Sequence, residues 1–215
     1  SYSVTGVQTC ALPIWTGSSL SSILDITNSG TMQANAVIGA DYIYDNVGAF
    51  GVRGGYTQAN NYVDDVTTDS TATTTVTNSG LIDVDLDLAA ADDIDYGEAG
   101  AFGVKLGYTY AYATGAGSAT ATTTITNTAS GVIDVFGDIE ADDYVHDSVG
   151  VYGVRLGYTQ YSGENAMATT LVQNAGAIRI GGSIRGEEWG DSVGFYGIDR
   201  KSTRLELQSP NTISY

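Results

Sequence analysis

Cysteine, proline and histidine are almost absent from this chain, and basic residues are few. The 215 residues include one Cys, two Pro and one His. A single cysteine excludes a disulfide scaffold, and one Cys with one His excludes most zinc sites and His-based catalytic triads. Eight Lys and Arg stand against 25 Asp and Glu, which gives a net charge of −17. That balance excludes nucleic acid as a partner, because phosphate binding needs clustered cations.

Long hydrophobic runs are missing as well. No stretch of 18 consecutive apolar residues is present, so the sequence predicts no transmembrane helix. Charged residues make up only 15% of the chain, whereas the 28 glycines and the many threonines favour β-strands joined by turns. The length suits one ordinary domain or a segment of a longer protein.

Both ends of the chain differ in character from the middle. Val4–Ile14 reads VTGVQTCALPI and resembles, at all eleven positions, the conceptual translation of a common short-read sequencing adapter. Asp199–Leu205 reads DRKSTRL and resembles the opposite strand of that adapter. The cysteine and both prolines fall in these ends. We therefore predict adapter-derived residues at 1–14 and 199–215, with a natural fragment at 15–198 between them.

The middle of the chain is an internal repeat of two blocks. Copies of the first block, which reads VTNSGLIDVD in the second copy, begin at Ile26, Val76, Ile125 and Val172. Copies of the second block, which reads GAFGVKLGYT in the second copy, begin at Gly48, Gly100, Gly150 and Gly194. The spacings between these glycines are 52, 50 and 44 residues. The fourth copy breaks off after Ile198, where the adapter match begins.

Within each copy, apolar and polar residues alternate. The stretches 82–88 and 102–112 both show this period of two, which predicts strands with one buried face. Asn-Ser-Gly at 78–80 predicts the turn before the first of them, because Asn and Gly tolerate positive φ. The threonine-rich segments 71–75 and 120–124 favour further strands.

A period near 50 residues with several strands per copy predicts an all-β fold, a parallel β-helix (β-solenoid) built from ~50-residue repeats. Stacking supplies the cover that one turn lacks, and we expect two turns of about 20–25 residues per copy. The absence of proline from 15–198 agrees, because every solenoid strand needs its N–H for pairing. Two other architectures stay open: a β-propeller with blades of similar period, and an outer-membrane β-barrel with alternating, aromatic-rich strands.

The recurring N-S-G-x-I element, followed by alternating Val, Ile and small polar residues, resembles the passenger domains of bacterial autotransporter adhesins. The resemblance covers about Leu24 to Ile198. It implies a parallel β-helix displayed on the cell surface, export across both membranes, and a flanking C-terminal β-barrel translocator. It carries over no functional residue, because the shared pattern is structural. A cysteine-free chain independently suits export through an oxidising periplasm.

Basic and aromatic residues recur at equivalent places in the copies. The basic row consists of Arg53, Lys105 and Arg155. We interpret it as an outward row that offsets neighbouring acids, and gripping carboxylates or sulfated sugars is the alternative. The two aromatic rows are Phe50, Phe102, Tyr152 and Tyr196, and Tyr56, Tyr108 and Tyr158. We predict that both rows pack in the core, because their parity matches that of Val104 and Leu106, and binding of sugar rings by exposed tyrosines is the alternative.

Acidic residues form two further rows. One row lies seven residues before the glycine that opens the second block, here called the block glycine, and consists of Asp41, Asp93, Asp143 and Glu187. The other lies three residues before it and consists of Asp45, Asp147 and Asp191. Two turns per copy would place successive members about 10 Å apart. We predict a solvated, solubilising edge. The candidate calcium ligands are Asp92, Asp93 and Asp95, and Asp142, Asp143 and Asp147. His146 is predicted to be a solvated turn residue.

The sequence therefore predicts a non-catalytic, surface-exposed or secreted passenger module of a bacterial autotransporter, adhesin-like and fragmentary. We assign it no catalytic, cofactor-binding or metal-binding residues, and no cofactor. Its expected partner is an unknown surface receptor or glycan, and its expected location is the cell surface, the outer membrane or the extracellular space. The alternative from another class is a β-helical polysaccharide-processing enzyme. Its site would show as a local departure from the repeat that gathers acidic and basic side chains.

Removal of the two predicted adapter-derived ends tests the division of the chain. Deleting residues 1–14 and 199–215 is expected to leave a cooperative thermal transition, because the repeats lie within 15–198. Circular dichroism of the full and trimmed chains measures this. A trimmed chain that unfolds without a cooperative transition would contradict the predicted boundaries.

Overall fold

The fold is a stack of parallel β-coils. The computed structural model describes residues 7–9, 20–43, 46–62, 68–95, 98–114, 116–145, 148–190 and 192–200. Within these ranges the chain consists of strands and their connections, and none of it forms a helix that could cross a membrane. The strand pairs described there are all parallel. Parallel pairing confirms the β-solenoid and excludes a propeller, whose blades are antiparallel.

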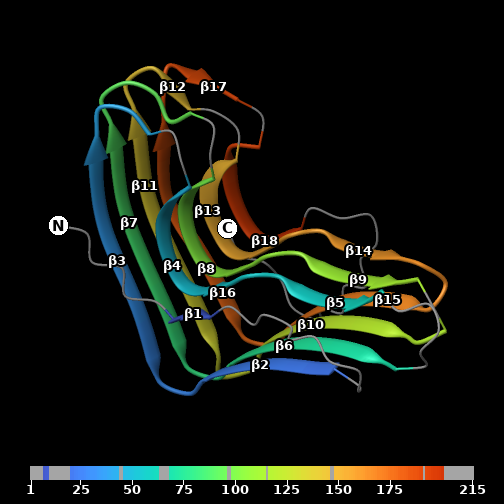
Figure 1. Ribbon diagram of the computed structural model, residues 1–215. Helices are drawn as coiled ribbons and strands as arrows, with labels where there is room; N and C mark the ends of the chain where they lie inside the picture. Colours follow the sequence, from blue (N-terminus) through green and yellow to red (C-terminus); the bar gives the residue numbers. More distant parts are fainter. Residues whose placement is uncertain are drawn as a thin grey trace.

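Four successive coils make up the stack (Figure 1). The first contains β2 (Leu20–Asn28), β3 (Thr31–Ala40), β4 (Val47–Gly54) and β5 (Thr57–Asn61). The second contains β6 (Ser70–Asn78), β7 (Leu81–Ala90), β8 (Ala99–Leu106) and β9 (Thr109–Ala113). The third contains β10 (Ala119–Asn127), β11 (Val132–Ala141), β12 (Tyr144–Val145), β13 (Val149–Leu156) and β14 (Thr159–Ser162). The fourth contains β15 (Ala166–Asn174), β16 (Ala177–Arg185), β17 (Glu188–Trp189) and β18 (Gly194–Arg200).

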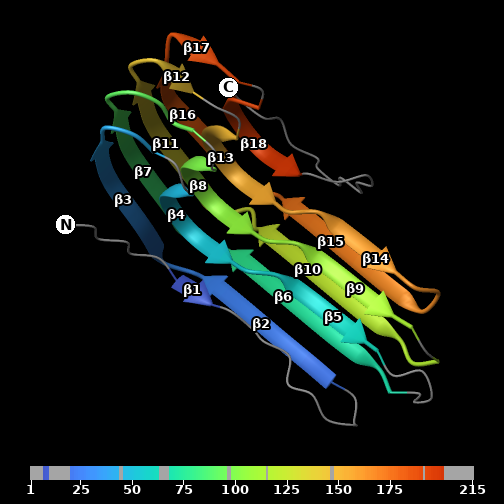
Figure 2. The ribbon, with the colours of Figure 1, turned by 45° about the horizontal axis from the view of Figure 1, so that its top comes forward.

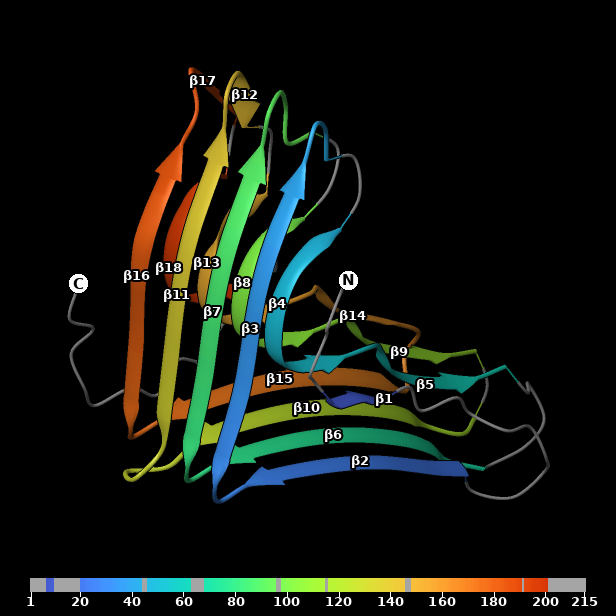
Figure 3. The same ribbon diagram turned by 90° about the vertical axis from the view of Figure 1, so that its left-hand side faces the viewer.

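The coils have an L-shaped outline with two arms (Figure 3). Strands β3, β7, β11 and β16 form the outer sheet of the upright arm, and β2, β6, β10 and β15 form the outer sheet of the lower arm. Strands β4, β8, β13 and β18 line the inner side of the upright arm and curve into the corner, while β5, β9 and β14 cover the lower arm. Equivalent strands of the four coils lie side by side in sequence order (Figure 2).

Each copy of the repeat makes one coil. Asn28 pairs with Asn78, and Asn78 pairs with Asn127, at separations of 50 and 49 residues. The prediction of two turns per copy is therefore wrong. One circuit of the L runs along both faces of two arms, and its long strands and connections use the whole copy.

The upright arm has an aliphatic interior. Ile82, Val84, Leu86 and Leu88 of β7 are each at most 1% exposed, whereas Asp85 and Asp87 between them face solvent. This confirms the alternation predicted for 82–88. On the inner sheet, the backbones of adjacent coils come closest at the glycines that open the second block. A Cβ on Gly100 would lie 1.9 Å from the carbonyl oxygen of Gly150. Only glycine fits there.

The lower arm has a thinner interior of alanine and threonine. Ile26, Val76 and Ile125 join the aliphatic cluster near the bend, and the separate cluster of the lower arm consists of Ala59, Ala72, Ala111, Ala113, Ala119 and Ala121. Six threonine hydroxyls continue this interior as one hydrogen-bonded chain, with O···O distances of 2.7 to 3.0 Å. Because each hydroxyl has one proton, donation runs in a single direction, from Thr159 through Thr170, Thr109, Thr123 and Thr57 to Thr74.

A ladder of asparagine amides marks the bend between the two outer sheets. The predicted Asn-Ser-Gly turn at 78–80 is present, and its asparagine points inward. Nδ2 of Asn78 donates to Oδ1 of Asn127 at 2.8 Å and to the carbonyl oxygen of Val132 at 3.1 Å. Oδ1 of Asn78 accepts from Nδ2 of Asn28 at 2.8 Å. The same pattern continues from Asn127 to Asn174, so each coil is locked to the next.

Parts of both predicted adapter-derived ends take part in the sheets. β1 (Val7–Thr9) pairs with residues 52–54 of β4, and Asp199 and Arg200 continue β18 beside β13. The origin of these ends stays a prediction.

Truncating the asparagine ladder is expected to destabilise the stack. Asn78→Ala removes three hydrogen bonds and leaves buried partners on both sides, so the free energy of unfolding should fall by about 2–4 kcal/mol. The exposed Asn35 on β3 provides the control, since Asn35→Ala should change it by less than about 0.5 kcal/mol. Urea unfolding measures both, and equal losses in the two variants would contradict the role of the ladder.

Candidate functional site

A buried ladder of aromatic rings lies along the inner sheet of the upright arm. Phe50, Phe102, Tyr152 and Tyr196 stack in succession with ring centroids 5.0 Å apart. Phe102 and Tyr152 are 0% and 1% exposed, which confirms the predicted core packing of this row. Burial raises the pKa of the Tyr152 phenol well above its usual range.

The basic row lies on this ladder, with one cation in each of the first three coils. Cζ of Arg53 is 4.7 Å from the centroid of the Phe50 ring, and Cζ of Arg155 is 4.3 Å from that of Tyr152. Nζ of Lys105 lies 4.5 Å from the centre of the Phe102 ring. The attraction of a cation to the ring face, about 0.5–2 kcal/mol, holds each side chain in place.

Glu98 neutralises part of the basic row. Its carboxylate forms an ion pair with Lys105 and accepts from Nη2 of Arg155 at 3.0 Å. This pairing agrees with the interpretation that the row offsets neighbouring acids. The predicted outward orientation is wrong for Arg155, which is 3% exposed because it packs on the Tyr152 ring. Burial lowers the pKa of Lys105, and its contact with Glu98 opposes that shift.

The second aromatic row is on the surface. Tyr56, Tyr108 and Tyr158 are 60%, 41% and 48% exposed, so their predicted place in the core is wrong. The period of two is interrupted here, because β8 ends at Leu106 and β9 begins at Thr109. The connection resets the alternation, and Thr109 and the alternate residues after it point inward instead.

The exposed tyrosines stack on one another. Ring centroids lie 5.1 Å apart between Tyr56 and Tyr108, and 5.5 Å apart between Tyr108 and Tyr158, with interplanar angles of 7° and 10°. Their faces therefore cover each other, and the ring edges and hydroxyl groups meet the solvent. A sugar ring has no free aromatic face to stack on between neighbouring tyrosines, but it can form hydrogen bonds to the hydroxyl groups.

A groove of about 540 Å³ runs across the coils between the basic row and the exposed tyrosines. The connections between β4 and β5, β8 and β9, and β13 and β14 form it at the inner corner of the L. A second hollow of about 410 Å³ lies beyond the tyrosines, beside Gln58, Tyr110 and Gln160. We call the larger hollow the corner groove.

Sequence reasoning missed Glu98 and the two glutamines. A signal for Glu98 is present in the repeat, because the equivalent positions of the other coils are Asn46, Ser148 and Ser192. Glu98 is thus a local departure from the repeat, and it brings a carboxylate to two of the three cations.

The acidic row at the end of the upright arm is shifted by one residue in the second coil. The bridges Ile43–Ile94 and Ile94–Val145 align Asp92, rather than Asp93, with Asp41 and Asp143. The count from the block glycine was wrong because the second coil has one more residue between this bridge and the glycine than the coils on either side. Successive members belong to adjacent coils, so their backbones lie about 4.8 Å apart rather than 10 Å.

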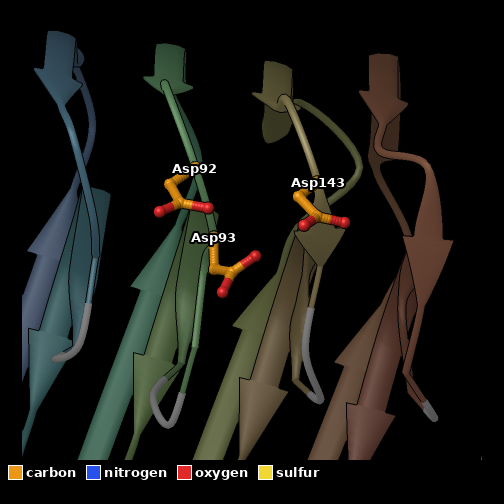
Figure 4. A group of neighbouring side chains, drawn as sticks. All are labelled: Asp92, Asp93 and Asp143. Carbon is orange, nitrogen blue, oxygen red and sulfur yellow. The ribbon is translucent and has the colours of Figure 1, made fainter.

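Asp92, Asp93 and Asp143 form the tightest acidic group described (Figure 4). One carboxylate oxygen from each lies within 4.8 Å of the other two. Oδ1 of Asp93 already accepts the backbone N–H of Tyr144 at 3.0 Å. The predicted third member, Asp95, instead accepts from the Tyr42 hydroxyl at 3.3 Å. With one oxygen from each, the three carboxylates supply three of the six to eight oxygens that calcium requires.

Several predicted residues lie outside the described part of the chain. They are Asp45, His146, Asp147 and Asp191.

Comparisons with known proteins returned no match: no protein family, no curated sequence and no solved structure shows significant similarity to the chain.

Cations are expected to act on the acidic edge by screening alone. Sodium, magnesium and calcium chloride at equal ionic strength should raise the melting temperature equally, because closely spaced carboxylates repel each other less when screened. Differential scanning calorimetry measures this for the chain and for Asp92→Asn, with the exposed Asp25→Asn as control. Stabilisation by micromolar calcium alone, lost in Asp92→Asn and kept in Asp25→Asn, would overturn this expectation.

Proposed function

We propose that the chain is a non-catalytic, adhesin-like repeat module of a bacterial autotransporter passenger, displayed on the cell surface or secreted. One observation carries the proposal: the corner groove receives a cation and a tyrosine from each of three successive coils. A surface that repeats with the coil suits an extended receptor or glycan, which offers the same groups at intervals along its length. A compact small molecule is bound in a more enclosed pocket.

The way in which the coils hold together supports export. Each coil contacts its neighbours through ladders and parallel strands, so the stack can form coil by coil as the chain emerges. The predicted natural fragment has no cysteine that could be oxidised before passage across the outer membrane.

A polysaccharide-processing enzyme is the second candidate, and Glu98 favours it. Glu98, Lys105 and Arg155 gather acidic and basic groups at one point, and burial lowers the pKa of Lys105, which is the direction that a general base needs. Two contacts oppose that role. Lys105 is ion-paired with Glu98 and lies on the Phe102 ring, and both contacts favour the charged ammonium over the neutral amine that a base requires.

Surface display tests the adhesive function. The chain, fused in place of the passenger of an autotransporter, should be degraded by external protease on intact Gram-negative cells. Those cells should adhere to an array of glycans and receptors more strongly than cells carrying the translocator alone. Retention in the periplasm, or display without adhesion to any surface, would contradict the proposal.

The same displaying cells test whether the chain is instead a polysaccharide-processing enzyme. The chain is expected to release no new ends from polysaccharide substrates. Release of such ends that is lost in Lys105→Met, with adhesion unchanged, would favour the polysaccharide-processing alternative.

A further inference from the structure

Arg155 holds a buried hydrogen-bond donor without a partner. Nη2 pairs with Glu98 at 3.0 Å, and Nε lies 3.7 Å from the Asp199 carboxylate. Nη1 is buried and makes no hydrogen bond to the residues that the structure describes. An unpaired buried donor is costly, and more so when it carries charge. Arg155 is also part of the lining of the corner groove, where an acceptor from a ligand would satisfy Nη1.

A second cation in the groove is exposed. Arg53 lies on the Phe50 ring and forms no ion pair within the described ranges. It is two coils away from Arg155, or about 10 Å at the spacing of paired strands. Between them, Lys105 is ion-paired with Glu98, whose carboxylate also pairs with Nη2 of Arg155. Three cations thus stand against the carboxylates of Glu98 and Asp199, so the row keeps a net positive charge, with Arg53 and Nη1 of Arg155 unpaired among the described residues. A positive row along the stack suits a chain with anionic groups at regular intervals.

The net negative charge of the protein does not prevent such binding. The acids of β7 and β11 lie on the outer face of the upright arm, away from the corner. At physiological salt the Debye length is about 8 Å, so distant exposed carboxylates are largely screened. The charged side chains that line the groove are the basic row and Glu98, and the Asp199 carboxylate lies beside Arg155.

The groove favours a sugar chain over a peptide. Strands β4, β8 and β13 are each paired on both sides, so they present no free edge to which a peptide strand can add. The tyrosine faces are covered by stacking, which leaves hydroxyl groups as the main contacts of that wall. The groove therefore has tyrosine hydroxyl groups on one wall and cations on the other. A polymer that is rich in hydroxyl groups and carries negative charge can bind to both walls.

We propose that the corner groove binds a linear anionic polysaccharide along the axis of the stack. A carboxylate or sulfate group accepts from Nη1 of Arg155, a second pairs with Arg53, and the sugar hydroxyls bond to the hydroxyl of Tyr108 and its neighbours. The inference rests on the proposed adhesive function and names the class of its ligand.

Binding of the full chain to immobilised hyaluronan, chondroitin sulfate and neutral dextran tests the proposal. The chain should bind at least one of the two anionic polymers at physiological salt and should not bind dextran. Arg53→Gln and Arg155→Gln should each raise Kd about tenfold, and Tyr108→Phe about fivefold, as expected for loss of a charged or a neutral hydrogen bond. The matched control is Arg179→Gln on the outer sheet, where Arg179 pairs with Asp134, and it should leave Kd unchanged.

Comparing the polymers identifies the anionic group. Equal binding of hyaluronan and chondroitin sulfate would show that the groove binds the carboxylate groups that both polymers carry. Preference for chondroitin sulfate would show that it binds the sulfate groups. Arg53 is exposed, so Arg53→Gln stays informative if Arg155→Gln fails to fold, which the thermal melt will show.

Four results would overturn the proposal: no binding to either anionic polymer, equal binding to dextran, equal weakening by Arg179→Gln, or binding to polyglutamate as tight as to the polysaccharides. Adhesion of displaying cells to another receptor, with no binding of the purified chain to these polymers, would refute the ligand class while leaving the adhesive function in place.

Discussion

Each coil lies in register on the coil before it, so most side chains pack against their own counterparts. The adjacent backbones are about 4.8 Å apart, and the groups in one row must therefore tolerate a like neighbour at close range. Aliphatic residues do so by burial, and aromatic rings by stacking at 5.0 Å in the row of Phe50, Phe102 and Tyr152. Asparagine does so because its amide both donates and accepts, and Asn78 uses both functions at once.

Charge is the one property that such stacking penalises. The basic row is stabilised by two additions, the aromatic faces beneath it and the carboxylate of Glu98 between two of its members. Among the residues that the structure describes, the acidic edge around Asp92 and Asp143 has the backbone N–H of Tyr144 and solvent to offset repulsion. The chain thus places its compensated charges at the inner corner and its uncompensated ones at an exposed turn, where water and salt screen them.

The repeat and the alternation at 82–88 were enough to predict a parallel solenoid with a period near 50 residues. The number of coils per copy was not predictable from period alone, because it depends on how many long strands one circuit contains. Alternation also fails across short connections, which is why Tyr108 was placed in the core and lies on the surface. Counting along the chain misaligned Asp93 by one residue. Glu98 was visible as a departure from the repeat, but its contacts depend on the stacking and could not be inferred.

The equivalence of successive coils also bears on the gene. Repeated segments recombine with one another, and loss of one whole copy from this chain would bring Asn28 against Asn127, with the ladder intact. Most of the stack would be shorter and otherwise unchanged. The corner would change, because the second coil carries Glu98 and Lys105. Without that coil, Arg53 and Arg155 would become direct neighbours with no carboxylate between them. A change in the number of repeat copies would then alter the charge density of the corner groove, and with it the ligands that the groove can bind.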